Sequence, residues 1–104
     1  MAEEKRQGST LTRDRYKRPS KYAVIFHNDD FTTTDFVVKV LRQVFFLPME
    51  EAVELMMKVH NSGSAAVGTY PLDIAQSKAQ TTMRMARAED FPLKVTIEEE
   101  TLPF

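Results

Sequence analysis

The sequence contains no cysteine. That absence excludes a disulfide framework, a thiol nucleophile and a cysteine-ligated zinc site, and it fits a reducing compartment. No apolar stretch approaches the roughly 20 residues that a membrane-spanning helix needs, and the N-terminal residues lack the apolar segment of a secretory signal. We therefore expect a cytoplasmic protein that does not enter a membrane.

Sequence motifs of several enzyme classes are also missing. There is no glycine-rich phosphate-binding loop and no Gly-x-Ser-x-Gly motif around a nucleophilic serine. The 104 residues provide for one domain with a modest core. We expect a monomeric protein that is not an enzyme and uses no cofactor.

Charge is nearly balanced over the whole chain, with a formal net charge of -1, but it is unevenly distributed. Residues 1–20 carry six Lys or Arg side chains against three Asp or Glu side chains and are almost free of apolar residues. This composition is typical of a disordered extension. We predict that residues 1–20 form such an extension and that residues 21–104 form the domain.

The hydrophobic pattern of the domain predicts three strands and three helices. Threonines at 33 and 34 can cap the first helix, Pro48 can open the second, and Gly63 can end it. On the second helix, Val53, Met56, Met57 and His60 are predicted to share one face. The expected order is β-α-α-β-α-β, a three-stranded sheet with helices packed on it, with elements at about 21–27, 34–46, 48–62, 64–70, 72–87 and 93–97.

A cluster of hydrogen-bond acceptors follows the first strand. Asn28 offers an amide oxygen, and Asp29 and Asp30 offer two adjacent carboxylates. Acceptors of this kind suit a cationic donor such as an ammonium group. About thirty residues later, the second predicted helix brings apolar side chains and the imidazole of His60, so a polar rim could lie above an apolar slot.

Several segments together resemble the ClpS adaptor proteins of bacteria over about residues 20–98. Each motif is weak alone, but their order and spacing together are specific. The matching segments are Tyr22–Thr32, Asp35–Val38, Met56, Val59-His60, Gly63, Gly68, Tyr70, Ala75, Lys78 and Pro92-Leu93. The resemblance implies the α/β fold of the C-terminal domain of ribosomal protein L7/L12, with a three-stranded antiparallel sheet packed against three helices.

The resemblance also implies a function and a set of site residues. ClpS-like proteins bind the N-terminal residue of proteins marked for destruction and deliver them to the ClpA unfoldase of the Clp protease, or to a ClpC-type unfoldase. The α-amino group would be bound by Asn28, Asp29 and His60, with Asp30 at the rim, while His27 is interpreted as an exposed strand end outside the site. Asp73 and Lys78 would meet the N-terminal domain of the unfoldase. The implied pocket for a large hydrophobic side chain (Leu, Phe, Tyr or Trp) consists of Phe26, Thr32, Thr34, Val37, Met56, Val59 and Leu93.

One position departs from the family pattern. ClpS proteins commonly have Thr-Pro-Met after the aromatic residue of this loop, where the present chain has Thr32-Thr33-Thr34. The methionine of that motif crowds the pocket and disfavours β-branched substrates. We therefore hypothesise that Thr34 alters the breadth of the pocket.

Two other classes of function remain as alternatives. His27, His60, Asp29 and Asp30 are possible ligands of zinc or manganese, which would suit a metal-dependent hydrolase, although their spacing matches no zinc motif. The basic extension and the ribosomal-type fold suggest a ribosomal or nucleic-acid-binding role, but the domain lacks a basic face and fold alone does not carry function. We expect no nucleic-acid partner and no bound metal.

Overall fold

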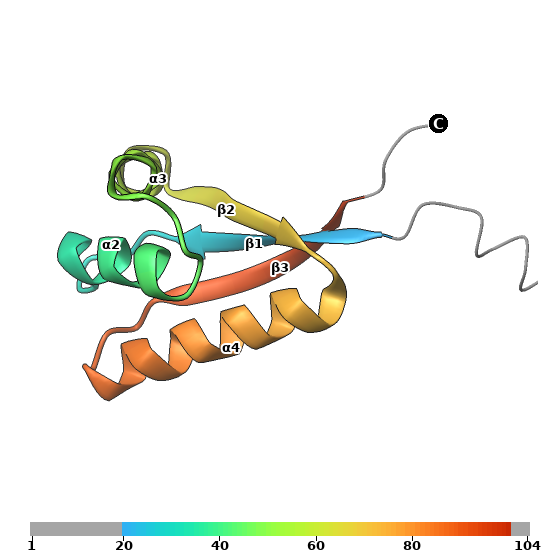
Figure 1. The fold of residues 1–104 in the computed structure, drawn as a ribbon. Coiled ribbons are helices and arrows are strands. Elements are labelled where there is room, and N and C mark those ends of the chain that lie inside the picture. The colour runs from blue at the N-terminus through green and yellow to red at the C-terminus, as the bar shows by residue number, and fades with distance from the viewer. Residues whose placement is uncertain (1–19, 101–104) are drawn as a thin grey trace, which may run out of the picture.

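The computed structural model describes residues 20–100. Its elements follow the predicted order (Figure 1). The predicted N-terminal extension lies outside the described residues, except for Ser20. The elements are β1 (Lys21–His27), α2 (Thr34–Gln43), α3 (Met49–Ser62), β2 (Ser64–Tyr70), α4 (Leu72–Ala88) and β3 (Lys94–Glu100).

The strands form one antiparallel sheet with β1 in the centre, in the order β2-β1-β3. His27, the last residue of β1, pairs with Ser64 of β2 and with Lys94 of β3. β1 therefore ends where β2 and β3 begin, and α2 and α3 lie at that same end of the sheet (Figure 1). The α+β fold predicted from the sequence is confirmed.

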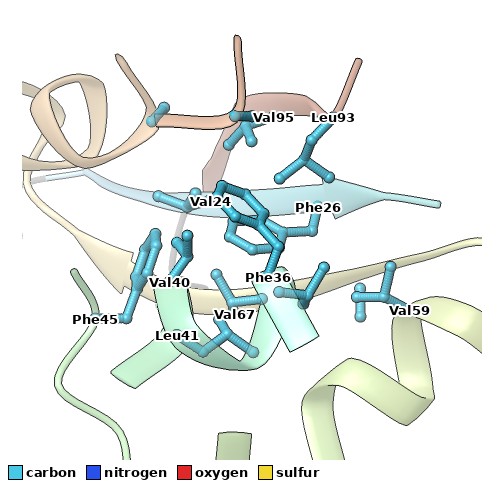
Figure 2. Close-up of a cluster of buried hydrophobic side chains, with 14 of the residues drawn as sticks. Val24, Phe26, Phe36, Val40, Leu41, Phe45, Val59, Val67, Leu93 and Val95 are labelled. Atoms are coloured by element: carbon cyan, nitrogen blue, oxygen red, sulfur yellow. The ribbon is translucent and has the colours of Figure 1, made fainter. Parts of the chain in front are cut away.

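The core lies between the sheet and the helices. Figure 2 shows Val24 and Phe26 of β1 among side chains from α2, α3, β2 and the 93–95 segment. Phe26 and Leu41 are fully buried, and the Phe26 ring meets the Phe45 ring edge-on at 5.6 Å between centroids. Such an aromatic pair adds to the hydrophobic stabilisation that burial gives.

Helix α2 is shorter than the sequence pattern predicts. It ends at Gln43 with Val44 as its C-cap, whereas the apolar spacing predicted a helix to about Phe46. Phe46 has a left-handed backbone with φ of 57° and leaves 78% of its surface exposed. The Leu47 N–H donates to the carbonyl oxygen of Leu41 at 3.1 Å, a bond that closes the end of the helix, and Leu47 itself is disfavoured in helical conformation because Pro48 follows it. At the other end of the domain, β3 extends three residues beyond the predicted Ile97.

Helix α3 contacts the core through a face that contains Ala52 and Val59. These two residues are buried and Met56 is half-buried, whereas Val53 and Met57 are 39% and 43% exposed. The face that Val53, Met56, Met57 and His60 share on this helix therefore lies largely outside the core.

Within residues 20–100, no helix is both long enough and apolar enough to cross a membrane.

Candidate functional site

A backbone hydrogen bond joins the end of β1 to the end of α3. The Asn28 N–H donates to the carbonyl oxygen of Gly63 at 2.8 Å. Gly63 has φ of 90°, the left-handed conformation that ends a helix and that glycine adopts without steric cost. Because His60 lies within one turn of Gly63, this bond places the imidazole beside the polar cluster that follows β1.

Asp29 organises the loop that carries this cluster. Its Oδ1 accepts from the backbone N–H groups of Phe31 at 2.8 Å and Thr32 at 2.7 Å, and its Oδ2 accepts from the Thr32 hydroxyl at 2.7 Å. Burial raises the pKa of Asp29, but the bonds from Thr32 and Phe31, together with the positive charge of Arg87, outweigh burial and lower it overall. The side chain is therefore a carboxylate held in a fixed orientation.

A cavity of about 250 Å³ opens at this point. Polar groups line the cavity beside apolar side chains of α2 and α3 and beside Leu93, the residue that precedes β3. Ten of the residues assigned from the sequence line it together: Asn28, Asp29, Asp30, Thr32, Thr34, Val37, Met56, Val59, His60 and Leu93. The structure thus assembles both the predicted polar rim and the predicted apolar slot in one place.

Phe26 is the predicted pocket residue that does not line the cavity. Its side chain has no exposed surface and stacks edge-on against Phe45. Leu93, which lines the cavity, belongs to the same cluster of buried side chains (Figure 2). Phe26 therefore belongs to the core that supports the pocket wall.

His27 was interpreted as an exposed strand end outside the site, and the structure corrects this. The residue is half-buried and lines the cavity. Its Nε2 lies 2.8 Å from the Thr96 hydroxyl oxygen. Thr96 is sixty-nine residues away in the chain, so no local pattern around His27 could have revealed the contact. The strand pairing alone brings the two together.

The polar groups of the cavity differ in what they already bind. Within residues 20–100, the side chains of Asn28, Asp30 and His60 make no hydrogen bond, and all three residues are exposed. Asp29 is bonded to its own loop, but a carboxylate has further lone pairs. The site therefore offers acceptors that a cationic ligand could use. The same part of the chain contains no cluster of three or more His, Asp or Glu side chains suited to a metal ion.

The two residues assigned to a protein partner do not line the cavity. Asp73 is exposed in the first turn of α4. Lys78 is half-buried, and its Nζ donates to the carbonyl oxygen of Val44 at 2.6 Å. The ammonium also lies 4.9 Å from the ring centroid of Phe46, 5.3 Å from that of Tyr70 and 5.5 Å from that of Phe45.

Comparison with known proteins gives consistent results. Residues 17–96 match the family model described as "ATP-dependent Clp protease adaptor protein ClpS". An adapter protein of that name from Neisseria gonorrhoeae is 47% identical over 81 residues, covering 78% of each chain. One from Desulfatibacillum aliphaticivorans is 43% identical over 95 residues, covering 89% of this chain and 91% of its own.

A solved structure is similar in fold as well as in sequence. It is Agrobacterium tumefaciens ClpS2 bound to L-phenylalaninamide, with a TM-score of 0.77 and 38% identity. The match covers 80% of the present chain and all of that one.

Proposed function

The chain belongs to the ClpS family, the adaptor proteins of the ATP-dependent Clp protease, and on that premise we propose which substrates it binds and how. It captures proteins that begin with a large hydrophobic residue (Leu, Phe, Tyr or Trp) and delivers them, in the cytoplasm, to a ClpA- or ClpC-type unfoldase. ClpS adaptors are non-catalytic binding proteins, so the hydrolase alternative is set aside.

The polar end of the cavity supports capture of a free α-amino group. An α-ammonium carries three N–H donors, and Asn28, Asp29 and His60 provide an amide oxygen, a carboxylate and a ring nitrogen in one place. Hydrogen bonds of a charged donor are stronger than those between neutral groups. An internal peptide segment has no ammonium and would leave these acceptors unpaired, which costs free energy. Selection for a chain terminus follows from this difference.

The apolar end supports selection of the side chain. Val37, Val59 and Leu93 are all buried, and they line the cavity together with Met56. Burial of a Leu- or Phe-sized side chain contributes about 1.5–3 kcal/mol. Met56 can adapt to different shapes because its side chain is flexible and polarizable. The single observation that carries the proposal is this union of acceptors and apolar walls in one cavity. A relative bound to phenylalaninamide, an amino acid amide with a free amine and an aromatic side chain, supports it.

The test is a binding panel of peptides that differ only at the first residue: Leu, Phe, Tyr, Trp, Ile, Val and Ala. Each is measured by fluorescence anisotropy with a free N-terminus and with an acetylated one. The large hydrophobic residues should bind well only when the amine is free. Equal binding of free and acetylated peptides would refute capture of the α-amino group.

Delivery to the unfoldase involves other parts of the chain. We assign Asp73 and Lys78 to contact with the N-terminal domain of the unfoldase, and the basic extension to a later step of delivery. Deletion of residues 2–18 should leave peptide affinity unchanged but reduce degradation of a reporter with an N-terminal Phe by the Clp protease. Loss of peptide binding and of delivery in equal measure would contradict this division.

A further inference from the structure

The guanidinium of Arg87 spans two carbonyl groups near the cavity. Arg87 lies in the last turn of α4, and its Nη1 donates to the carbonyl oxygens of Phe91 and Leu93, each at 2.9 Å. Arg87 itself does not line the cavity. Leu93 does, and it is only 1% exposed. We propose that Arg87 is a positioning residue for N-terminal residue recognition, which holds Leu93 in place as a wall of the pocket. This inference rests on the proposed function.

The segment between α4 and β3 depends on this side chain for its shape. The first part of the segment is bonded to α4, because the N–H groups of Glu89 and Phe91 both donate to the carbonyl oxygen of Ala86, at 3.0 and 2.9 Å. Asp90 adopts a left-handed backbone with φ of 63°. Beyond Phe91, Pro92 has no N–H with which to bond the segment. The Arg87 guanidinium is the side chain that ties the carbonyls on either side of this proline to α4.

The position of Leu93 affects the cavity directly. Its side chain belongs to the buried core cluster that also contains Phe26 (Figure 2), and a packed side chain of this kind has little freedom to shift without changing its neighbours. If the 91–93 segment loosens, Leu93 moves with it and the apolar end of the cavity changes shape. Discrimination between substrate side chains of different shape should then fall.

Arg87 also acts on the polar end of the cavity through its charge. Burial raises the pKa of Asp29, whereas the bonds from Thr32 and Phe31 and then the Arg87 charge lower it. The cation therefore helps to keep Asp29 ionised while its guanidinium binds the carbonyl of Leu93. One residue outside the cavity thus influences both the ammonium contact and the side-chain pocket.

Other contacts keep the fold intact without this guanidinium. The Phe91 ring packs edge-on against Phe36 at 5.2 Å between centroids, and Lys39 forms an ion pair with Glu89 at 3.0 Å. A variant that lacks the guanidinium should therefore loosen the 91–93 segment and leave the domain folded.

The test compares Arg87→Met, which keeps the apolar stem, with Arg87→Lys, which keeps the charge but whose ammonium ends a shorter side chain than the Nη1 that bonds both carbonyls. Arg84→Met is the matched control, because Arg84 is an exposed arginine of the same helix that does not line the cavity. Affinities for peptides beginning with Phe and Leu are measured across the acid range of pH. Amide hydrogen exchange of residues 91–95 is measured in the unbound proteins.

Arg87→Met should weaken the Phe peptide by about three- to tenfold, the loss expected from one or two hydrogen bonds, and change the ratio between Phe and Leu. It should also move the acid loss of binding to higher pH, because Asp29 loses a nearby positive charge. Arg87→Lys should restore the wild-type pH at which binding is lost in acid, but not the wild-type ratio of Phe to Leu peptide affinities. Arg84→Met should alter neither.

Hydrogen exchange separates this inference from the proposed function. Faster exchange at 91–95 in Arg87→Met alone supports the positioning role even if no N-terminal peptide binds the wild type, in which case only the proposed function fails. Wild-type exchange rates and an unchanged Phe-to-Leu ratio in Arg87→Met would overturn the inference. Equal losses in Arg87→Met and Arg84→Met would overturn it as well.

Discussion

The Nζ of Lys78 lies 2.6 Å from the carbonyl oxygen of Val44, and this contact joins α4 to the end of α2. Val44 is the C-cap of α2, where carbonyl groups lack partners within the helix and the helix dipole favours a cation. A lone lysine in a sequence is normally solvated. Here its half-buried ammonium is bonded to the backbone and lies within 5.5 Å of the centroids of three aromatic rings.

Lys78→Met should therefore lower the free energy of unfolding by about 1–2 kcal/mol, since it removes a charged hydrogen bond and cation–π contacts but keeps the apolar stem. Urea denaturation measures the change. Peptide affinity should be unaffected because Lys78 does not line the cavity. Lys58→Met, at an exposed lysine of α3, is the control, and equal stability of the two variants would contradict the structural role.

Gly63→Ala tests the bond that joins β1 to α3. A Cβ at this position meets no atom within 4 Å, but the φ of 90° is unfavourable for alanine, at a cost of about 1–2 kcal/mol. The variant should lose stability, and its affinity for a Phe peptide should fall as His60 shifts relative to Asn28. Gly63→Asn should retain more of both, because asparagine tolerates the left-handed conformation. Identical behaviour of the two variants would rule out backbone strain as the cause.

Asp29→Asn isolates the charge of the polar end, because the amide oxygen can still accept the N–H groups of Phe31 and Thr32. Loss of a charged hydrogen bond of about 1.5–3 kcal/mol predicts roughly 10- to 100-fold weaker binding of a free-amine peptide. Calorimetry measures the affinity of each variant for the peptide. If Asp29→Asn also greatly lowers the stability of the domain, the loss of binding would come from a disrupted loop and not from the lost charge.

The same carboxylate sets an acid limit of binding that His60→Gln isolates, because the glutamine amide keeps an acceptor oxygen and does not change its charge with pH. Interactions that lower the pKa of Asp29 keep it ionised below the usual aspartate value of about 3.9. The remaining binding by His60→Gln should persist through pH 5 and fade only below about pH 4. The carboxylate's contribution to stability is likewise present above its unfolded pKa and is lost as the pH falls through the lower folded value. A midpoint for binding by His60→Gln above pH 5 would contradict this assignment.

Thr34→Met tests the hypothesis about pocket breadth. Thr34 is exposed in the first turn of α2 and lines the cavity, so a longer side chain there would narrow the opening. We expect the wild type to bind peptides beginning with Ile or Val better, relative to Leu, than the variant does. Thr69→Met, at an exposed threonine of β2 outside the cavity lining, is the control. If Thr34→Met leaves the affinities for Ile and Val peptides unchanged relative to Leu, the hypothesis is contradicted.

The sequence predicted the elements well where local chemistry decides them. The β-branched and aromatic content of Lys21–His27 and the glycine after α3 predicted the correct ends. The predicted helix through Phe46 was too long because Val44, Phe45 and Phe46 continue the apolar pattern beyond Gln43, where α2 ends. Aspartate side chains commonly bond nearby backbone N–H groups in loops, and Asp29 does so with Phe31 and Thr32.

Contacts between distant parts of the chain were beyond local rules. The bond of Lys78 to Val44 spans thirty-four residues, and that of His27 to Thr96 depends on the pairing of β1 with β3. Nothing around Arg87 in the sequence indicates that it binds the carbonyls of Phe91 and Leu93. Such contacts depend on how the elements pack, and no periodicity or short motif records them.

The central position of β1 has a mechanical consequence. The strand begins at the end of the sheet opposite the cavity (Figure 1), and all seven of its residues pair with β3 while six pair with β2. A force applied to the chain before Lys21 therefore acts along the strand and loads both hydrogen-bonded ladders in shear, with many bonds sharing the load at once. The domain should therefore resist unfolding by a force applied at its N-terminal side, and the cavity at the far end of the sheet should keep its shape.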